Sequence, residues 1–206
     1  MYTDIIWDFD GTLVDTYPSM VRSMMQALQE MGVQYDQETV WRMMRESVRY
    51  TAEQAEKQHG VDKQALMRAY RKNNEKVDPF SVRMFPKAKE ALQRVCEKEG
   101  KNFIFTHRGT SIFPYLQAHG IEKYFTAVVC QEQGFQRKPS GEGNRYIMRT
   151  YGAVPGKTLA VGDREIDIAA AHDADIKACF YAPYGRVETD AAYIIETYAE
   201  LAPLIG

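Results

Sequence analysis

Short apolar segments recur along the chain, with almost no alternation of polar and apolar positions inside them. They cover residues 5–7, 102–106, 127–130, 158–161 and 178–181. Continuous apolar runs of this length are typical of strands that are covered on both faces, as in a parallel sheet. The pattern therefore predicts strands at these places in one mainly parallel sheet.

Amphipathic stretches lie between most of these runs. Residues 86–99 place Ala88 and Leu92 on one face, with Pro86 at the start and Gly100 after the end. These start and stop signals are typical of an α-helix. Similar patterns predict helices over residues 111–119, 145–151, 166–172 and 190–198. Strands that alternate with helices predict an α/β fold with a doubly wound, Rossmann-like parallel sheet.

One long region breaks this alternation. Between the first two predicted strands, Gly32 and Gly60 separate stretches that have helical periodicity and no strand pattern. These stretches predict helices over residues 19–31, 36–46, 52–59 and 62–76. An all-helical block at this place predicts an inserted cap domain of residues 16–80, so that residues 1–15 and 81–206 form the α/β core domain.

Charge and hydropathy narrow the functional classes. The 206 residues carry 26 basic and 28 acidic side chains, and no stretch is strongly one-signed. A nucleic-acid-binding protein would show a basic stripe, so we expect no nucleic-acid partner. Because no apolar run approaches the roughly 20 residues of a membrane span, we expect no membrane association. No heptad pattern or apolar face stands out, which leaves a monomer and a weak dimer open.

The cysteines and the N-terminus indicate the compartment. Cys96, Cys130 and Cys179 are widely spaced and form no CxxC or metal-binding pattern, which is typical of reduced thiols in a cytosolic protein. The first residues, MYTDIIWDFD, lack the basic start and apolar core of a signal peptide. We therefore expect a cytoplasmic protein.

Two carboxylates follow the first predicted strand. Asp8 and Asp10 stand two residues apart, before Gly11-Thr12, at the strand end where open α/β sheets bind ligands. One carboxylate there can attack a phosphoryl group and form an aspartyl-phosphate. The other can protonate the leaving oxygen and then activate water. A turn with a capping aspartate would explain the same residues structurally.

A second acidic pair follows the fourth predicted strand. Asp163 and Asp167 stand four residues apart, after Gly162 and at the start of a predicted helix. Oxygen-rich sites with few protein ligands suit Mg²⁺. Acids that cap a helix and favour its first turn would show the same spacing, so the pair alone does not separate these two explanations.

Polar residues also follow the second and third predicted strands. The Thr106 hydroxyl and the amides after it could hold phosphate oxygens, and His107 and Arg108 come next, where they could contact substrate. Lys138 precedes Pro139, which keeps the residue before it extended, and could present its ammonium to a phosphate. Taken singly, a strand-end threonine and a loop lysine are more typical of structural or solvated positions.

In the order DxD, Thr, Lys-Pro and GDxxxD, the chain resembles the haloacid dehalogenase-like hydrolase superfamily, and within it the phosphatases that carry a helical cap after the first motif. The resemblance covers essentially the whole chain. It implies that Asp8 is the nucleophile and Asp10 the general acid and base. It also implies that Thr106 binds the transferred phosphoryl group and that Lys138 neutralises its charge.

The same resemblance implies a magnesium site. Asp163 would coordinate Mg²⁺ together with Asp8 and the backbone carbonyl of Asp10. Asp167 would bind a metal-bound water or orient Lys138. The family often has Asn after the second-motif Thr, where this chain has His107.

Electrostatics supports a divalent cation independently. Two unit charges about 4 Å apart repel by about 4 kcal/mol at an effective dielectric constant of about 20. Four converging carboxylates could therefore not accept a phosphate dianion unaided. Lys138 cancels one negative charge and Mg²⁺ cancels two, so the predicted chemistry requires the metal.

The resemblance implies a Mg²⁺-dependent hydrolase that acts on the phosphomonoester of a small metabolite, with phosphoglycolate phosphatase as the first model. A phosphomutase similar to β-phosphoglucomutase would use the same motifs and return the phosphoryl group to its substrate. A non-catalytic regulator could keep the fold and bind a phosphorylated ligand. Product analysis separates the first two, and a generic phosphatase assay tests the third.

Overall fold

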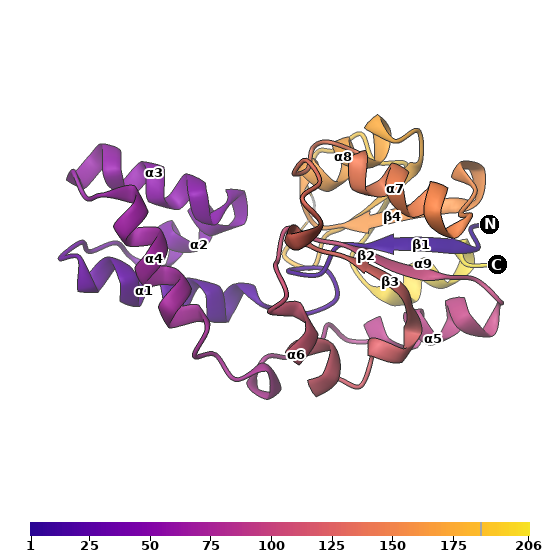
Figure 1. The fold of residues 1–206 in the computed structure, drawn as a ribbon, viewed down its shortest axis with the longest axis horizontal. Helices are drawn as coiled ribbons and strands as arrows, with labels where there is room; N and C mark the ends of the chain where they lie inside the picture. Colours follow the sequence, from indigo (N-terminus) through magenta and orange to yellow (C-terminus); the bar gives the residue numbers. More distant parts are fainter. Residues whose placement is uncertain (186) are drawn as a thin grey trace. The chain divides into compact units, whose positions relative to one another are not determined.

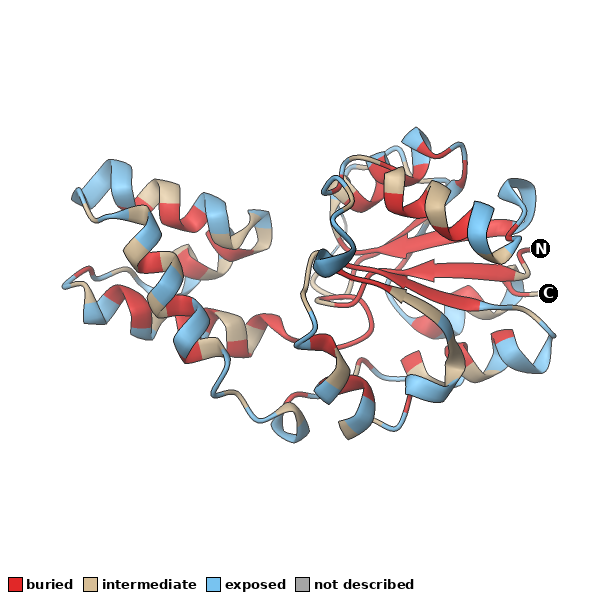
Figure 2. Ribbon diagram, in the orientation of Figure 1, coloured by how far each residue is buried: buried red, intermediate tan, exposed pale blue. Residues whose placement is uncertain are grey.

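The chain folds into two compact units in a computed structural model that describes residues 1–185 and 187–206. The first unit contains residues 1–15 and 83–206, and the second contains residues 16–82 (Figure 1). Each unit has its own buried core (Figure 2). The helical second unit is inserted directly after the first strand of the other.

The first unit is built on a parallel sheet, which confirms the predicted fold class. Among the described residues the sheet has six strands in the order β3-β2-β1-β4-β5-β6, and every neighbouring pair is parallel. The strands are β1 (Asp4–Trp7), β2 (Asn102–Phe105), β3 (Phe125–Val129), β4 (Thr158–Gly162), β5 (Lys177–Tyr181) and β6 (Tyr193–Ile195). Every residue of β1, β2 and β4 is buried, which explains their unbroken apolar patterns.

Helices cover both faces of this sheet (Figure 1). On one face lie α7 (Glu142–Tyr151) and α8 (Glu165–Asp173), whose Ile147 and Ile168 share one core cluster with Phe103 of β2. The other face is covered by α5 (Ala88–Glu97), α6 (Ile112–Ala118) and α9 (Tyr198–Leu201). Short 3-10 helices cover Pro79–Ser81, Glu122–Tyr124, Gln131–Gln133, Pro155–Lys157 and Ala202–Leu204.

The predicted helix over residues 190–198 is wrong. Its middle is strand β6, which pairs with β5 through Tyr181 and Ile195, and its last residue begins α9. Aromatic and β-branched side chains at Tyr193, Ile194 and Ile195 favour a strand, and the open edge of β5 supplies its hydrogen bonds. The sheet therefore overrides the weak helical periodicity of this segment.

The second unit consists of helices α1 (Tyr17–Glu30), α2 (Gln37–Glu46), α3 (Val48–His59) and α4 (Lys63–Asn74). Three of them begin at a side chain that accepts a hydrogen bond from a first-turn amide, namely Asp36, Ser47 and Asp62. Their apolar faces meet in a core that includes Met24, Met43, Met44, Leu28 and Leu66. No helix in the described part of the chain is both long and apolar enough to cross a membrane.

Candidate active site

The chain leaves β1 through a tight turn that begins at the first predicted site residue. The Asp8 amide donates to the Val161 carbonyl at 2.8 Å and so extends the pairing of β1 with β4. The next residues fold back until the Gly11 amide donates to the Val14 carbonyl at 2.9 Å. Gly11 has φ +81°, which favours glycine at this position. The turn holds the Asp8 side chain at the carboxyl edge of the sheet.

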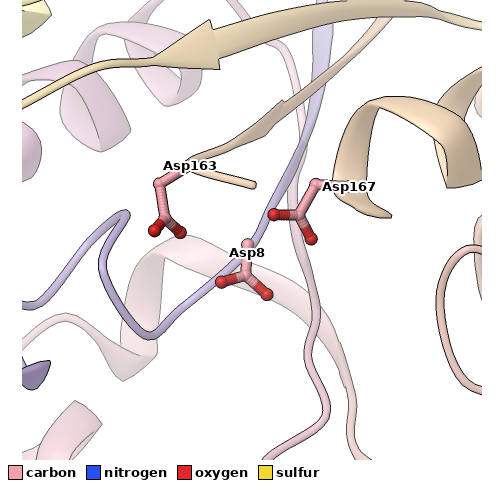
Figure 3. A group of neighbouring side chains, drawn as sticks. All are labelled: Asp8, Asp163 and Asp167. Atoms are coloured by element: carbon pink, nitrogen blue, oxygen red, sulfur yellow. The ribbon is translucent and has the colours of Figure 1, made fainter. Parts of the chain in front are cut away.

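Three of the predicted acids meet at this edge. Ligand oxygens of Asp8, Asp163 and Asp167 all lie within 4.8 Å of one another. Figure 3 shows their carboxylates gathered around a common space, from the ends of β1 and β4 and the first turn of α8. The three residues are 3%, 1% and 5% exposed. A Cβ at Gly162 would lie 2.3 Å from the Asp167 Cβ, so only glycine fits between β4 and this carboxylate.

Lys138 joins the group from the loop before α7. Its Nζ lies 2.7 Å from Asp8 Oδ1 and 2.7 Å from Asp167 Oδ1. The ammonium also lies 5.0 Å from the centre of the Phe105 ring, at the end of β2. The lysine side chain is buried, so its ammonium is not hydrated, and the two carboxylates offset the cost of this desolvation.

The two carboxylates that share Lys138 differ in pKa. Burial raises the pKa of Asp8 to about 6, although Lys138 opposes this shift. Burial also disfavours ionised Asp167, but Lys138 and Arg164 hold the pKa of that carboxyl below its usual range. The negative charge of Asp167 adds to the upward shift of the Asp8 pKa. Asp167 Oδ2 also accepts a hydrogen bond from the Arg164 amide at 3.1 Å, whereas Asp8 Oδ2 has no hydrogen-bond partner.

The unpartnered oxygen of Asp8 indicates whether these residues can hold a metal ion. A buried carboxylate oxygen without a donor is costly, and Asp8 Oδ2 stands beside two further carboxylates. Carboxylate oxygens are the ligands that hard divalent cations prefer. The donor set therefore fits a divalent cation.

Asp10 is paired with a cation of its own. Arg108 Nη2 lies 2.6 Å from Asp10 Oδ1, and Arg108 Nε lies 3.1 Å and 3.0 Å from the two carboxylate oxygens. The guanidinium lies 4.9 Å from the centre of the Tyr115 ring and 5.8 Å from that of Phe9. Arg108 thus adds a second positive charge to the site, which the sequence-based charge balance did not include.

Thr106 and His107 lie where β2 ends. Thr106 is buried, and its Oγ1 accepts a hydrogen bond from the Arg108 amide at 3.1 Å. His107 Nε2 accepts from the Lys138 amide at 2.7 Å. Burial, followed by the charge of Lys138, lowers the pKa of His107 to about 3. The imidazole is therefore neutral at ordinary pH, with its proton on Nδ1.

The low pKa of His107 predicts an acid-sensitive contribution to stability. Between pH 6.5 and 3 the unfolded chain binds a proton at this histidine that the folded chain does not, so stability falls as the pH falls. From pH 7 to pH 5 this contribution amounts to about 2 kcal/mol. We expect His107→Gln to lose less stability than wild type over this interval by that amount, measured by urea unfolding. Equal losses in the two proteins would contradict the assignment.

Two positioning contacts were not predicted. Thr12 Oγ1 donates to Asp163 Oδ1 at 3.1 Å, and the Tyr198 hydroxyl donates to the Thr12 carbonyl at 2.7 Å. Thr12 belongs to the string after Asp10 and could have been found from it. Nothing in the sequence pattern points to Tyr198, which lies 186 residues further along the chain.

We expect Tyr198→Phe to lower the free energy of unfolding by about 1–3 kcal/mol, because the buried Thr12 carbonyl loses its donor. Tyr181 provides a matched control. Its ring centre lies 4.6 Å from that of Tyr198, and no hydrogen bond to its hydroxyl occurs among the described residues. Urea unfolding should show a change below about 0.5 kcal/mol for Tyr181→Phe. Equal effects of the two variants would mean that the Tyr198 hydrogen bond is not the cause.

Known proteins are similar to this chain in sequence and in fold. A pyrophosphatase PpaX from Oceanobacillus iheyensis is 22% identical over 209 residues, which cover 98% of this chain and 96% of that protein. A phosphoglycolate phosphatase from Vibrio parahaemolyticus is 24% identical over 195 residues, which cover 88% of this chain and 83% of the relative.

Solved structures show the same architecture. A Clostridium difficile protein superposes with a TM-score of 0.86 at 20% identity and covers 100% of this chain and 99% of its own. A HAD-superfamily hydrolase from Geobacter sulfurreducens superposes with a TM-score of 0.76 at 22% identity, covering 100% of this chain and 97% of its own. The family model for haloacid dehalogenase-like hydrolases matches residues 5–181. The chain therefore belongs to the haloacid dehalogenase-like hydrolase family.

Proposed function

We propose that the protein is a Mg²⁺-dependent phosphomonoester hydrolase that acts on a small phosphorylated metabolite of the cytoplasm through an aspartyl-phosphate. One observation carries this proposal. Asp8 is a buried carboxylate with one oxygen held by Lys138 and the other without a partner, beside the carboxylates of Asp163 and Asp167. A nucleophile next to a cation and a cation-binding acid cluster is the arrangement that phosphoryl transfer needs.

Asp8 and Asp163 would hold Mg²⁺ together with the backbone carbonyl of Asp10. When bound, the ion would offset negative charge on the carboxylates and on the phosphoryl group. Asp167 lies close enough to the other two carboxylates to serve the same site, although it also binds Lys138. Among the described residues, Lys138 and Arg108 form ion pairs with these acids, and the charge of Arg164 also acts on Asp8 and Asp167. Together they offset only part of the charge of the four acids.

In the first step, one oxygen of the Asp8 carboxylate would attack phosphorus. The bond from phosphorus to the ester oxygen breaks as the bond to Asp8 forms, and Asp10 gives its proton to the leaving oxygen. Thr106 would donate its hydroxyl hydrogen bond to a phosphoryl oxygen. Lys138, which already contacts Asp8, would stabilise the negative charge that moves onto that group.

In the second step, water would attack the aspartyl-phosphate. Asp10 takes a proton from the water, the bond between Asp8 and phosphorus breaks, and inorganic phosphate leaves. Asp10 has given up its proton in the first step, so it is ionised when the water attacks, and it lies 2.6 Å from Arg108 Nη2.

The relatives suggest the first substrates to test. Their names include phosphoglycolate phosphatase and pyrophosphatase, and both phosphoglycolate and pyrophosphate carry a second anionic group next to the scissile bond. We therefore place these two compounds first, with sugar phosphates and nucleotides as further candidates.

The test is a panel of these compounds and p-nitrophenyl phosphate, incubated with the purified protein in MgCl₂ or in EDTA. We expect inorganic phosphate to appear in MgCl₂ and to be lost in EDTA. Phosphate release that persists in EDTA would contradict the metal dependence. An isomeric sugar phosphate without free phosphate would identify a mutase instead. No reaction with any compound would favour a non-catalytic ligand-binding protein.

A further inference from the structure

Lys138 is a buried cation carried by an exposed stretch of chain. Its neighbours Arg137 and Pro139 are exposed, whereas the Lys138 side chain is buried with Nζ 2.7 Å from both Asp8 and Asp167. The side chain of a lysine is flexible and of limited reach, so it does not by itself fix the ammonium, and the loop must hold the backbone within reach of both carboxylates. The position of this backbone is therefore a separate requirement of the site.

The Lys138 amide is bound to the end of the neighbouring strand. It donates to His107 Nε2 at 2.7 Å, and His107 is the second residue after β2. Elsewhere in the loop, the Gln136 amide donates to Glu142 at the start of α7, while Pro139 has no amide hydrogen to offer. The bond to His107 thus joins the backbone of the lysine to the strand that lies beside β1.

His107 can accept this bond because its ring is neutral. Burial and the charge of Lys138 keep the pKa of the imidazole far below neutrality, so Nε2 retains its lone pair. Since Nε2 is occupied by the amide, only Nδ1 remains as the ring nitrogen that can carry a proton. The histidine therefore presents an acceptor of fixed direction to the loop.

We propose that His107 is a positioning residue: by accepting the Lys138 amide hydrogen bond, it fixes the lysine backbone and thereby the ammonium between Asp8 and Asp167. The effect on catalysis rests on the phosphatase function proposed above. The placement of the lysine does not rest on it, so the two ideas can fail separately.

Two amide variants test this proposal. The oxygen of Gln can reach the place of His Nε2, whereas the oxygen of Asn reaches only the place of Nδ1 and stops short of the Lys138 amide. Both variants remove the ring and keep a neutral polar group. With p-nitrophenyl phosphate and MgCl₂, we expect kcat/KM to fall by about 10- to 100-fold in His107→Asn and to stay within about threefold of wild type in His107→Gln.

A second readout follows the lysine without any turnover. The metal-free proteins are pulsed with acetic anhydride, and acetylation of Lys138 is quantified by mass spectrometry relative to the exposed Lys157. We expect Lys138 labelling to rise by about fivefold or more in His107→Asn and to remain at the wild-type level in His107→Gln. Circular dichroism verifies that both variants are folded.

Two results would overturn the proposal. One is wild-type labelling of Lys138 in His107→Asn, which would show that the lysine keeps its place without this acceptor. The other is equal impairment of the Gln and Asn variants, which would show that the ring itself is needed. If wild type released no phosphate from any compound, the proposed function would fail, and the labelling comparison would still decide the role of His107.

Discussion

We expect Asp8→Asn to lower the rate of phosphate release by about 1,000-fold or more, because an amide cannot form the aspartyl-phosphate. The substitution is nearly isosteric, and it removes the buried carboxylate whose pKa is raised to about 6. Lys138 keeps Asp167 as a charge partner, so the variant should fold. Steady-state release of phosphate in MgCl₂ measures the effect, with circular dichroism as the check on folding.

The same strand offers a matched control. Asp4 lies at the opposite end of β1, is also buried, and accepts from the Lys101 amide at 3.0 Å through an oxygen that Asn retains. Asp4→Asn should change kcat/KM by no more than about twofold. If Asp8→Asn kept more than about a tenth of the wild-type rate, Asp8 would not be the nucleophile.

Lys138→Met should cost both stability and activity. Without the ammonium, the buried carboxylates of Asp8 and Asp167 face each other uncompensated, which should lower the free energy of unfolding by about 3–5 kcal/mol at pH 8. The loss should be smaller at pH 5. Asp8 binds a proton in the folded state at higher pH than in the unfolded state, so its ionisation destabilises the fold only as the pH rises.

A double variant separates the charge balance from the chemistry. Lys138→Met with Asp167→Asn removes one charge of each sign, so we expect it to recover at least about half of the lost stability. Phosphate release should remain at least about 100-fold below wild type, because no ammonium faces the phosphoryl group. Urea unfolding and steady-state kinetics measure the two quantities. Recovery of activity in the double variant would contradict the role of Lys138.

Most of the fold could be predicted because its signals are local. Continuous apolar runs mark β1, β2 and β4, since these strands are buried on both faces. Helical periodicity, interrupted at Gly32 and Gly60, marks the helices of residues 16–82. The segment around β6 could not be predicted, because the edge of β5 decides its conformation and its own pattern is weak.

The candidate site could also be predicted in part. In a parallel sheet the carboxyl ends of all strands lie at one edge, so the sequence alone predicts that Asp8, Asp163 and Asp167 lie close together. The ligand oxygens of these three residues lie within 4.8 Å of one another, and Lys138 Nζ lies 2.7 Å from two of the carboxylates. These distances follow from tertiary packing, which no local sequence pattern predicts.

The sequence by itself determined which chemical groups stand at the ends of which strands, because hydrophobic periodicity and turn residues act over a few neighbours. Only the tertiary structure decided how those groups are paired. Arg108 binds Asp10 across 98 residues, the Lys138 amide binds His107 across 31, and Tyr198 reaches the turn after β1 across 186. A buried donor takes whichever acceptor the fold brings within about 3 Å, and that choice depends on the packing of the whole domain.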